Sequence, residues 1–144
     1  MALDVDLLER SFALVTSRGG QLSERFYARL FERNPGVRAM FAHLDMTEQQ
    51  KKLAASLGAI VGNLRKPDRL AEHLRDLGLR HGAIGAAPAH YAAVGESLLA
   101  VLQELSGDAW TPAVARAWTD AYGAVQTAML NAALETAPRR AVGE

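Results

Sequence analysis

The chain has 144 residues and no cysteine, and its 16 lysines and arginines balance its 16 aspartates and glutamates. Without cysteine, disulfides, thiol catalysis and thiolate metal sites are excluded. The balanced charge gives no support for a nucleic-acid partner or an anionic membrane surface. The length predicts one domain over residues 1–144, with a frayed tail at about 137–144 and enough core to leave room for a small-molecule pocket.

Hydropathy gives no indication of membrane insertion. No apolar run approaches the roughly 20 residues that a membrane-spanning helix requires. Residues 1–9 also lack the basic start and apolar middle of a secretion signal. We therefore expect a cytoplasmic protein that binds neither membrane nor nucleic acid. A monomer or a homodimer is expected.

The first half of the chain shows helical periodicity, with apolar residues three and four apart and no alternating strand pattern. In chain order, the sequence predicts a helix over 5–15 ended by 17–20, a helix over 22–31 stopped by Asn34-Pro35-Gly36, a short turn over 37–40 and a loop over 42–46. Thr47 followed by Gln50 has the form of a capping box, so the next helix is predicted to begin near Glu48.

The second half continues the same pattern. The predicted segments are a helix from about 48 to 64, a break at 65–68, a helix over 70–81 closed by 82–88, a helix over 91–105 ended by 106–108, and a last helix from Pro112 towards Glu135. Thr111 is predicted to be the N-cap of that last helix, with Pro112 at its first position. The fold class is therefore all-α.

His81 is the least expected residue of these stripes. Leu70, Leu74 and Leu77 recur along one helix face, and His81 takes the place of the next leucine, before Ile84. A buried imidazole needs a partner for each ring nitrogen. Tyr27 and Gln49 also occupy places where core residues are expected, on two other helices. Each alone is more often a satisfied core or boundary residue, but the three together could converge on one pocket.

Several spaced motifs resemble the globin family, specifically bacterial single-domain haemoglobins and the haem domain of flavohaemoglobins. The match runs from about Leu7 to Glu135. It comprises Phe26-Tyr27-x-x-Leu30-Phe31-x-x-Asn34-Pro35, then Phe41, Gln49-x-x-x-Leu53, His81, His90-Tyr91-x-x-Val94-Gly95-Glu96-x-Leu98-Leu99 and Ala117-Trp118-x-x-Ala121-Tyr122-Gly123. The resemblance implies a globin fold of helices A, B, C, E, F, G and H with little or no D helix, a three-over-three sandwich around haem.

The resemblance also implies a cofactor and its ligands. Haem b (iron protoporphyrin IX) would be held without a covalent bond, with His81 as the metal ligand. The residues expected to contact it are Phe41, Lys52, Leu53, Leu77, His81, Ile84, Tyr91, Val94 and Leu98. Among these, Lys52 would reach a propionate, unless it is simply solvated.

Four residues are implied in the chemistry. The Tyr27 hydroxyl and the Gln49 amide would stabilise bound dioxygen, and Tyr91 and Glu135 are candidates for a hydrogen bond to the second nitrogen of His81. The alternatives are a Tyr27 hydroxyl on a backbone carbonyl, a solvent-facing Gln49, a Tyr91 that is ordinary core and a solvated Glu135.

The implied function is reversible binding of dioxygen, nitric oxide and other diatomic gases. Conversion of nitric oxide to nitrate is the implied reaction. The sequence shows no flavin or nicotinamide domain up to Glu144, so we expect a separate reductase to supply electrons. A non-enzymatic oxygen carrier, store or gas sensor is the alternative, and a globin fold without haem is a third.

Overall fold

Helices account for nearly all of the computed structural model, which describes residues 3–18 and 21–136, the side chains of 135 and 136 excepted. Within these residues no strand occurs. The elements are α1 (Val5–Ser17), α2 (Leu22–Arg33), α3 (Pro35–Met40), α4 (Met46–Gly62), α5 (Pro67–Ala83), α6 (Pro88–Ser106), the 3-10 turn η1 (Gly107–Ala109) and α7 (Pro112–Thr136). The all-α prediction is confirmed.

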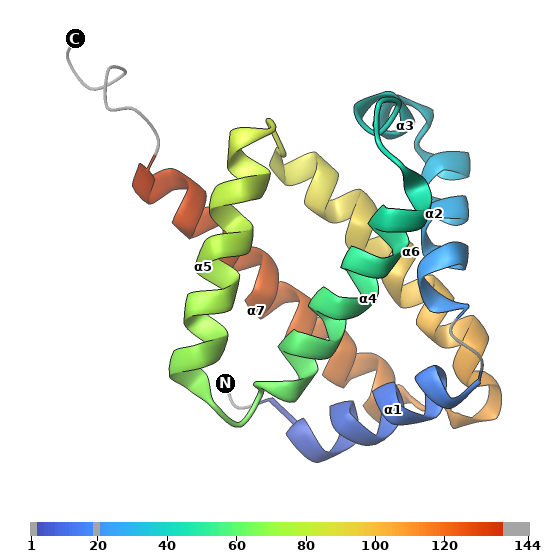
Figure 1. Ribbon diagram of the computed structural model, residues 1–144. Coiled ribbons are helices and arrows are strands. Elements are labelled where there is room, and N and C mark those ends of the chain that lie inside the picture. The colour runs from blue at the N-terminus through green and yellow to red at the C-terminus, as the bar shows by residue number, and fades with distance from the viewer. Residues whose placement is uncertain (1–2, 19–20, 137–144) are drawn as a thin grey trace, which may run out of the picture.

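The helices pack across one another in two layers (Figure 1). α5 lies mainly against α7, α2 lies against α6, and α1 packs against α6 and α7. α4 contacts α2 and α1. The segment 63–66 joins α4 to α5, and from there the two helices diverge (Figure 1). This is the predicted three-over-three arrangement.

Helix α4 begins at a cap that the sequence analysis did not assign. The Asp45 side chain accepts hydrogen bonds from the backbone N–H groups of Thr47 at 2.9 Å and Glu48 at 3.4 Å. The predicted Thr47–Gln50 capping box is therefore wrong, and the helix starts at Met46. Aspartate and threonine are both good N-caps, and the charged carboxylate is the stronger acceptor.

Helix α7 begins as predicted. The Thr111 hydroxyl accepts a hydrogen bond of 3.2 Å from the backbone N–H of Val114, and Pro112 is the first helical residue. Proline suits this place because its missing N–H would have no partner inside the helix. The cap fixes the end of α7 that packs against α1.

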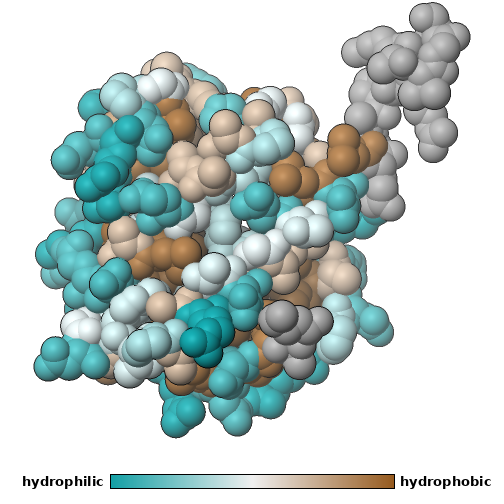
Figure 2. Space-filling view, turned by 180° about the vertical axis from the view of Figure 1, so that it is seen from behind, coloured by the Kyte–Doolittle hydropathy of each residue, from teal (hydrophilic) through white to brown (hydrophobic). Residues whose placement is uncertain are grey.

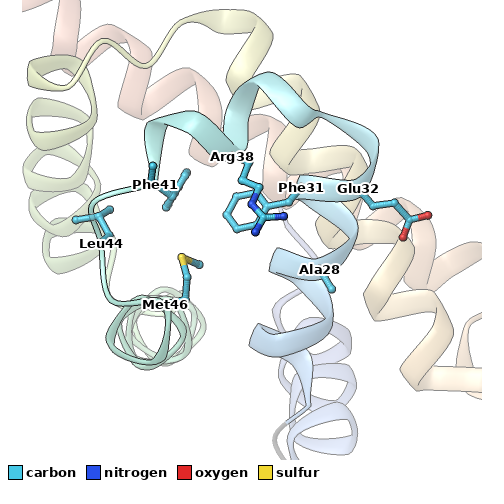
Figure 3. Close-up of a pocket in the computed structure, with 8 residues that line it drawn as sticks. Ala28, Phe31, Glu32, Arg38, Phe41, Leu44 and Met46 are labelled. Atoms are coloured by element: carbon cyan, nitrogen blue, oxygen red, sulfur yellow. The ribbon is translucent and has the colours of Figure 1, made fainter.

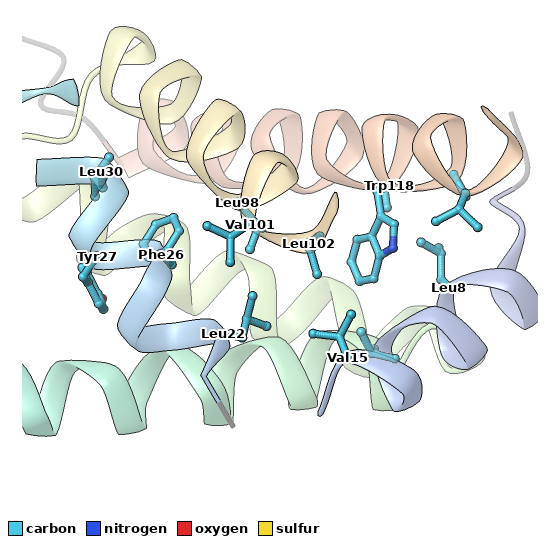
Figure 4. Packing of buried hydrophobic residues seen from close by; sticks show 14 residues of the cluster. Leu8, Val15, Leu22, Phe26, Tyr27, Leu30, Leu98, Val101, Leu102 and Trp118 are labelled. Carbon is cyan, nitrogen blue, oxygen red and sulfur yellow. The ribbon is translucent and has the colours of Figure 1, made fainter. Parts of the chain in front are cut away.

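The apolar core divides into two clusters of buried residues. The larger one joins α1, α2, α4, α6 and α7 and comprises Leu8, Val15, Leu22, Phe26, Tyr27, Leu30, Val61, Leu98, Val101, Leu102, Val114, Ala117, Trp118 and Ala121. In Figure 4, Leu98, Val101 and Leu102 of α6 lie between the side chains of α2 and α1. The smaller cluster has Leu74, Tyr91 and Met129 at its centre.

A buried polar contact within the larger cluster ties α1 to α7. The indole N–H of Trp118 donates a hydrogen bond of 2.9 Å to the hydroxyl of Ser11. Because a buried indole N–H without a partner is costly, Ser11 lets a large aromatic residue fill the core. The apolar stripe of the first helix gave no indication of this role for a serine.

The surface is mainly hydrophilic on the face opposite to that of Figure 1, with separate apolar areas (Figure 2). Among the described helices, we find none with the length and hydropathy needed to cross a lipid bilayer.

Two glycines allow α5 to approach α7 closely. A Cβ atom at Gly78 would collide with the backbone oxygen of Met129 and lie 2.8 Å from the Met129 Cα. One at Gly82 would lie 2.9 Å from the Cβ of Ala133. No side chain fits at Gly78 unless the two backbones move apart. This contact fixes the distance of α5 from α7.

The Gly78 contact predicts opposite effects for two glycine-to-alanine changes. Gly78→Ala should lower the free energy of unfolding by about 1–3 kcal/mol, because overpacking must be relieved by a backbone shift. Gly58→Ala should raise it by about 0.5–1 kcal/mol, since alanine is the better helix former. Gly58 lies inside α4, and a Cβ added there would meet no atom within 4 Å. Urea denaturation measures both, and equal effects would contradict the close crossing.

Candidate functional site

His81 lies in the last turn of α5, and one of its ring nitrogens is already bonded. Its Nδ1 atom lies 2.7 Å from the backbone oxygen of Leu77, four residues earlier. Since that oxygen only accepts, Nδ1 carries the proton and Nε2 keeps a free lone pair. Among the described residues, Nε2 has no hydrogen-bond partner. The ring is therefore held in the tautomer that a metal ligand requires.

Tyr91 lies beside His81, near the start of α6. The two ring centroids are 6.4 Å apart, and Tyr91 is buried in the smaller cluster. The backbone oxygen of Tyr91 accepts a hydrogen bond of 2.6 Å from the Tyr122 hydroxyl of α7. Leu77 supplies the partner of Nδ1, which the sequence analysis did not anticipate. A bond from the Tyr91 hydroxyl to His81 stays a prediction.

Tyr27 occupies the other side of the site, on α2. Its ring lies 5.7 Å from that of Phe31 and 5.7 Å from that of Phe41, between centroids. The residue is 9% exposed, and burial raises the pKa of its phenol. At neutral pH the Tyr27 phenol is consequently a neutral hydrogen-bond donor, with the rings of Phe31 and Phe41 beside it.

The Tyr27 side and the His81 side belong to different clusters of the core. Leu53 of α4 and Val94 of α6 pack with Tyr27 on the larger cluster, whereas Leu77 packs on the smaller one. All three are only partly buried, although leucine and valine are common core residues. α6 contributes to both clusters, through Leu98 and Tyr91. Leu53, Val94 and Leu77 thus keep part of their apolar surface accessible, next to the two clusters.

The remaining predicted residues have different positions. Gln49 lies in the first turn of α4 and is partly buried, while Lys52 is exposed on the same helix. Ile84 follows the end of α5 and is 68% exposed, so it does not extend the buried leucine stripe. Glu135 belongs to α7, but its side chain lies outside the described residues. A role for these four residues therefore stays a prediction.

Comparison with known proteins identifies the family. A family model described as Globin matches residues 24–129. The chain belongs to the globin family. The prediction from the spaced motifs is thereby confirmed, and proteins of this family bind haem and diatomic gases.

Flavohemoproteins are among the relatives of this globin. That of Rhizobium meliloti is 34% identical over 120 residues, covering 82% of this chain and 30% of that protein. That of Rhodopirellula baltica is 38% identical over 112 residues, covering 76% of this chain and 28% of that protein. The globin thus spans less than a third of the length of these curated relatives.

Solved structures support the fold. A Pseudomonas aeruginosa protein described as structurally highly homologous to human hemoglobin gives a TM-score of 0.79 at 25% identity, covering 89% of this chain and 96% of that one. A hexacoordinated heme protein from a tardigrade gives 0.78 at 15% identity, covering 90% and 92% of the two chains, which shows the common fold alone.

The residues of this globin fit a haem. The donor set offers one neutral imidazole, His81, with Nδ1 bonded to Leu77 and Nε2 available for a metal. Partly buried leucine and valine side chains on α4, α5 and α6 supply apolar contacts for a porphyrin. Tyr27 supplies a hydroxyl donor from the opposite cluster.

All three tyrosines of the chain are predicted to titrate above their ordinary pKa. Burial raises the pKa of Tyr27, Tyr91 and Tyr122 above 10.0, and the nearby Tyr91 adds to the effect at Tyr122. Because these groups hold their protons more tightly when folded, their contribution to stability is complete below pH 10 and is lost as the pH rises through the folded values. Tyrosinate absorbance and circular dichroism should therefore change together in strong alkali. A tyrosine ionising at pH 10 with helicity intact would contradict this.

Proposed function

We propose that this globin binds haem b through Nε2 of His81 and reversibly binds dioxygen, which it uses to convert nitric oxide to nitrate. The observation that best supports the proposal is the bond between His81 Nδ1 and the Leu77 oxygen, 2.7 Å long. Haem b, when bound, supplies an iron that takes a diatomic gas and exchanges an electron. The remaining tasks fall to the protein.

His81 has two tasks in this proposal. Its Nε2 lone pair would hold the iron, and the Leu77 carbonyl fixes the orientation of the ring and its tautomer. The bond at Nδ1 also makes the imidazole a better electron donor at Nε2. The Tyr91 ring, at 6.4 Å between centroids, limits the space into which the His81 ring can turn.

Tyr27 would stabilise the bound gas. A neutral phenol would donate a hydrogen bond to the partial negative charge that dioxygen acquires. Phe31 and Phe41, each 5.7 Å from Tyr27 between ring centroids, fix the position of the donor. Gln49, in the first turn of α4, is the proposed second donor.

The proposed reaction needs an electron source. Nitric oxide, dioxygen and one electron together give nitrate, so every turnover consumes one reducing equivalent. We propose that a reductase supplies it. Without an electron donor the same residues would support an oxygen carrier or store.

Single-turnover and multiple-turnover measurements separate these functions. Haem-loaded protein under dioxygen should form about one nitrate per haem on addition of nitric oxide, and continue only when a reductase is present. His81→Gly, which lacks the proposed iron ligand, is the matched control and should form none. If nitrate stays absent while the wild type binds dioxygen reversibly, the protein is a carrier and the proposed reaction is wrong.

The proposed role of Tyr27 predicts the rate of dioxygen release. Tyr27→Phe should speed release about tenfold or more, because a hydrogen bond to a charged group contributes about 1.5–3 kcal/mol. Tyr122→Phe also loses a hydroxyl, from a partly buried residue, but that hydroxyl donates to the Tyr91 carbonyl and its loss should affect release much less. Stopped-flow displacement of dioxygen by carbon monoxide gives both rates. Unchanged release in Tyr27→Phe would exclude its hydroxyl as the donor.

A further inference from the structure

A hollow lies between α2, α3 with the segment that follows it, and the start of α4. Its volume is about 410 Å³, and its lining comprises Ala28, Phe31, Glu32, Arg38, Phe41, Ala42, Leu44 and Met46. In Figure 3, Phe31, Phe41 and Met46 approach this space from three different segments of the chain. The sequence analysis expected Phe41 to contact haem and did not predict this hollow.

Two residues of the hollow also surround Tyr27. The Phe31 and Phe41 rings lie 5.3 Å apart between centroids, and each lies 5.7 Å from the Tyr27 ring. The hollow is therefore lined by two of the rings that neighbour Tyr27, the residue that carries the proposed hydroxyl donor.

The lining combines apolar and charged residues, and its apolar members Ala28 and Ala42 are exposed. Six of the eight lining residues are alanine, phenylalanine, leucine or methionine. Glu32 and Arg38 are exposed, and Leu44 is 37% exposed, so the hollow communicates with solvent. Phe31, Phe41 and Met46 are the partly buried members of the lining, and their side chains offer water few hydrogen-bond partners. This part of the hollow suits a neutral diatomic gas better than an ion.

We propose that this hollow is the route by which dioxygen and nitric oxide reach the site, with Phe31 and Phe41 as its inner gate. Both residues are partly buried. Rotation of their side chains alone would open a passage. The inference rests on the proposed function and adds to it the path of the gas. It assigns Phe31 and Phe41 to access, while Tyr27 determines retention.

Filling the hollow tests the route. Ala28→Trp and Leu44→Trp each place an indole in the hollow, the first from a helix and the second from the loop before α4. Leu14→Trp is the matched control, since Leu14 lines a second hollow of about 160 Å³ formed by α1, η1 and α7. Each variant is loaded with haem, and carbon monoxide association and dissociation are measured by flash photolysis and by ligand replacement.

A blocked route raises the same barrier for both directions. Ala28→Trp and Leu44→Trp should therefore slow association and dissociation by the same factor, about fivefold or more, with no change in Kd. Leu14→Trp should change neither rate. Unchanged rates in both hollow variants would overturn the route, as would slower association with unchanged dissociation.

Failure of the proposed function would look different. If the wild type gives no carbon monoxide spectrum after haem addition, haem-based gas binding itself is wrong, and the route with it. If Ala28→Trp fails to fold, Leu44→Trp still tests the route, because Leu44 lies in the loop before α4 and not in a helix.

Discussion

The close approach of α5 to α7 at Gly78 is the constraint on which the rest of the structure depends. Backbone there meets backbone, with the Met129 Cα 2.8 Å from where a Cβ would lie. α5 is thereby held against α7 while α4 packs on α2 and α1, so that α4 and α5 diverge (Figure 1). His81 lies three residues after Gly78 on the same helix. The Gly78 contact therefore also determines how far His81 lies from α7.

The two sides of the site are built by different physical means. On the α5 side, the Leu77 carbonyl fixes one histidine nitrogen and leaves the other for a ligand. On the α2 side, the rings of Phe31 and Phe41 lie beside the ring of Tyr27, and burial raises the pKa of its phenol. Helix α6 contributes residues to both clusters, so a change in its position would alter both sides. The proposed metal ligand and the proposed hydrogen-bond donor thus lie on different helices and share α6 as a neighbour.

Sequence periodicity predicted most of this fold, because the spacing of apolar residues indicates which face of an amphipathic helix is buried. The Thr111 cap was predictable, whereas Asp45 was missed because two good capping residues stand close together. His81 and Tyr27 were recognised as polar residues in apolar stripes. The partner of His81 is a backbone oxygen, which no residue pattern reveals, and the Phe31–Phe41 pair requires the fold of the chain around α3.

The bond between His81 and iron is the central claim, and resonance Raman spectroscopy tests it most directly. The chain has four histidines, so a variant that keeps only His81 can be prepared, loaded with haem and labelled with ¹⁵N-histidine. The account predicts an iron–histidine stretching band in the ferrous protein that shifts with the label. A ferrous haem-loaded protein without a label-sensitive band would show that another group holds the iron, and would contradict the account.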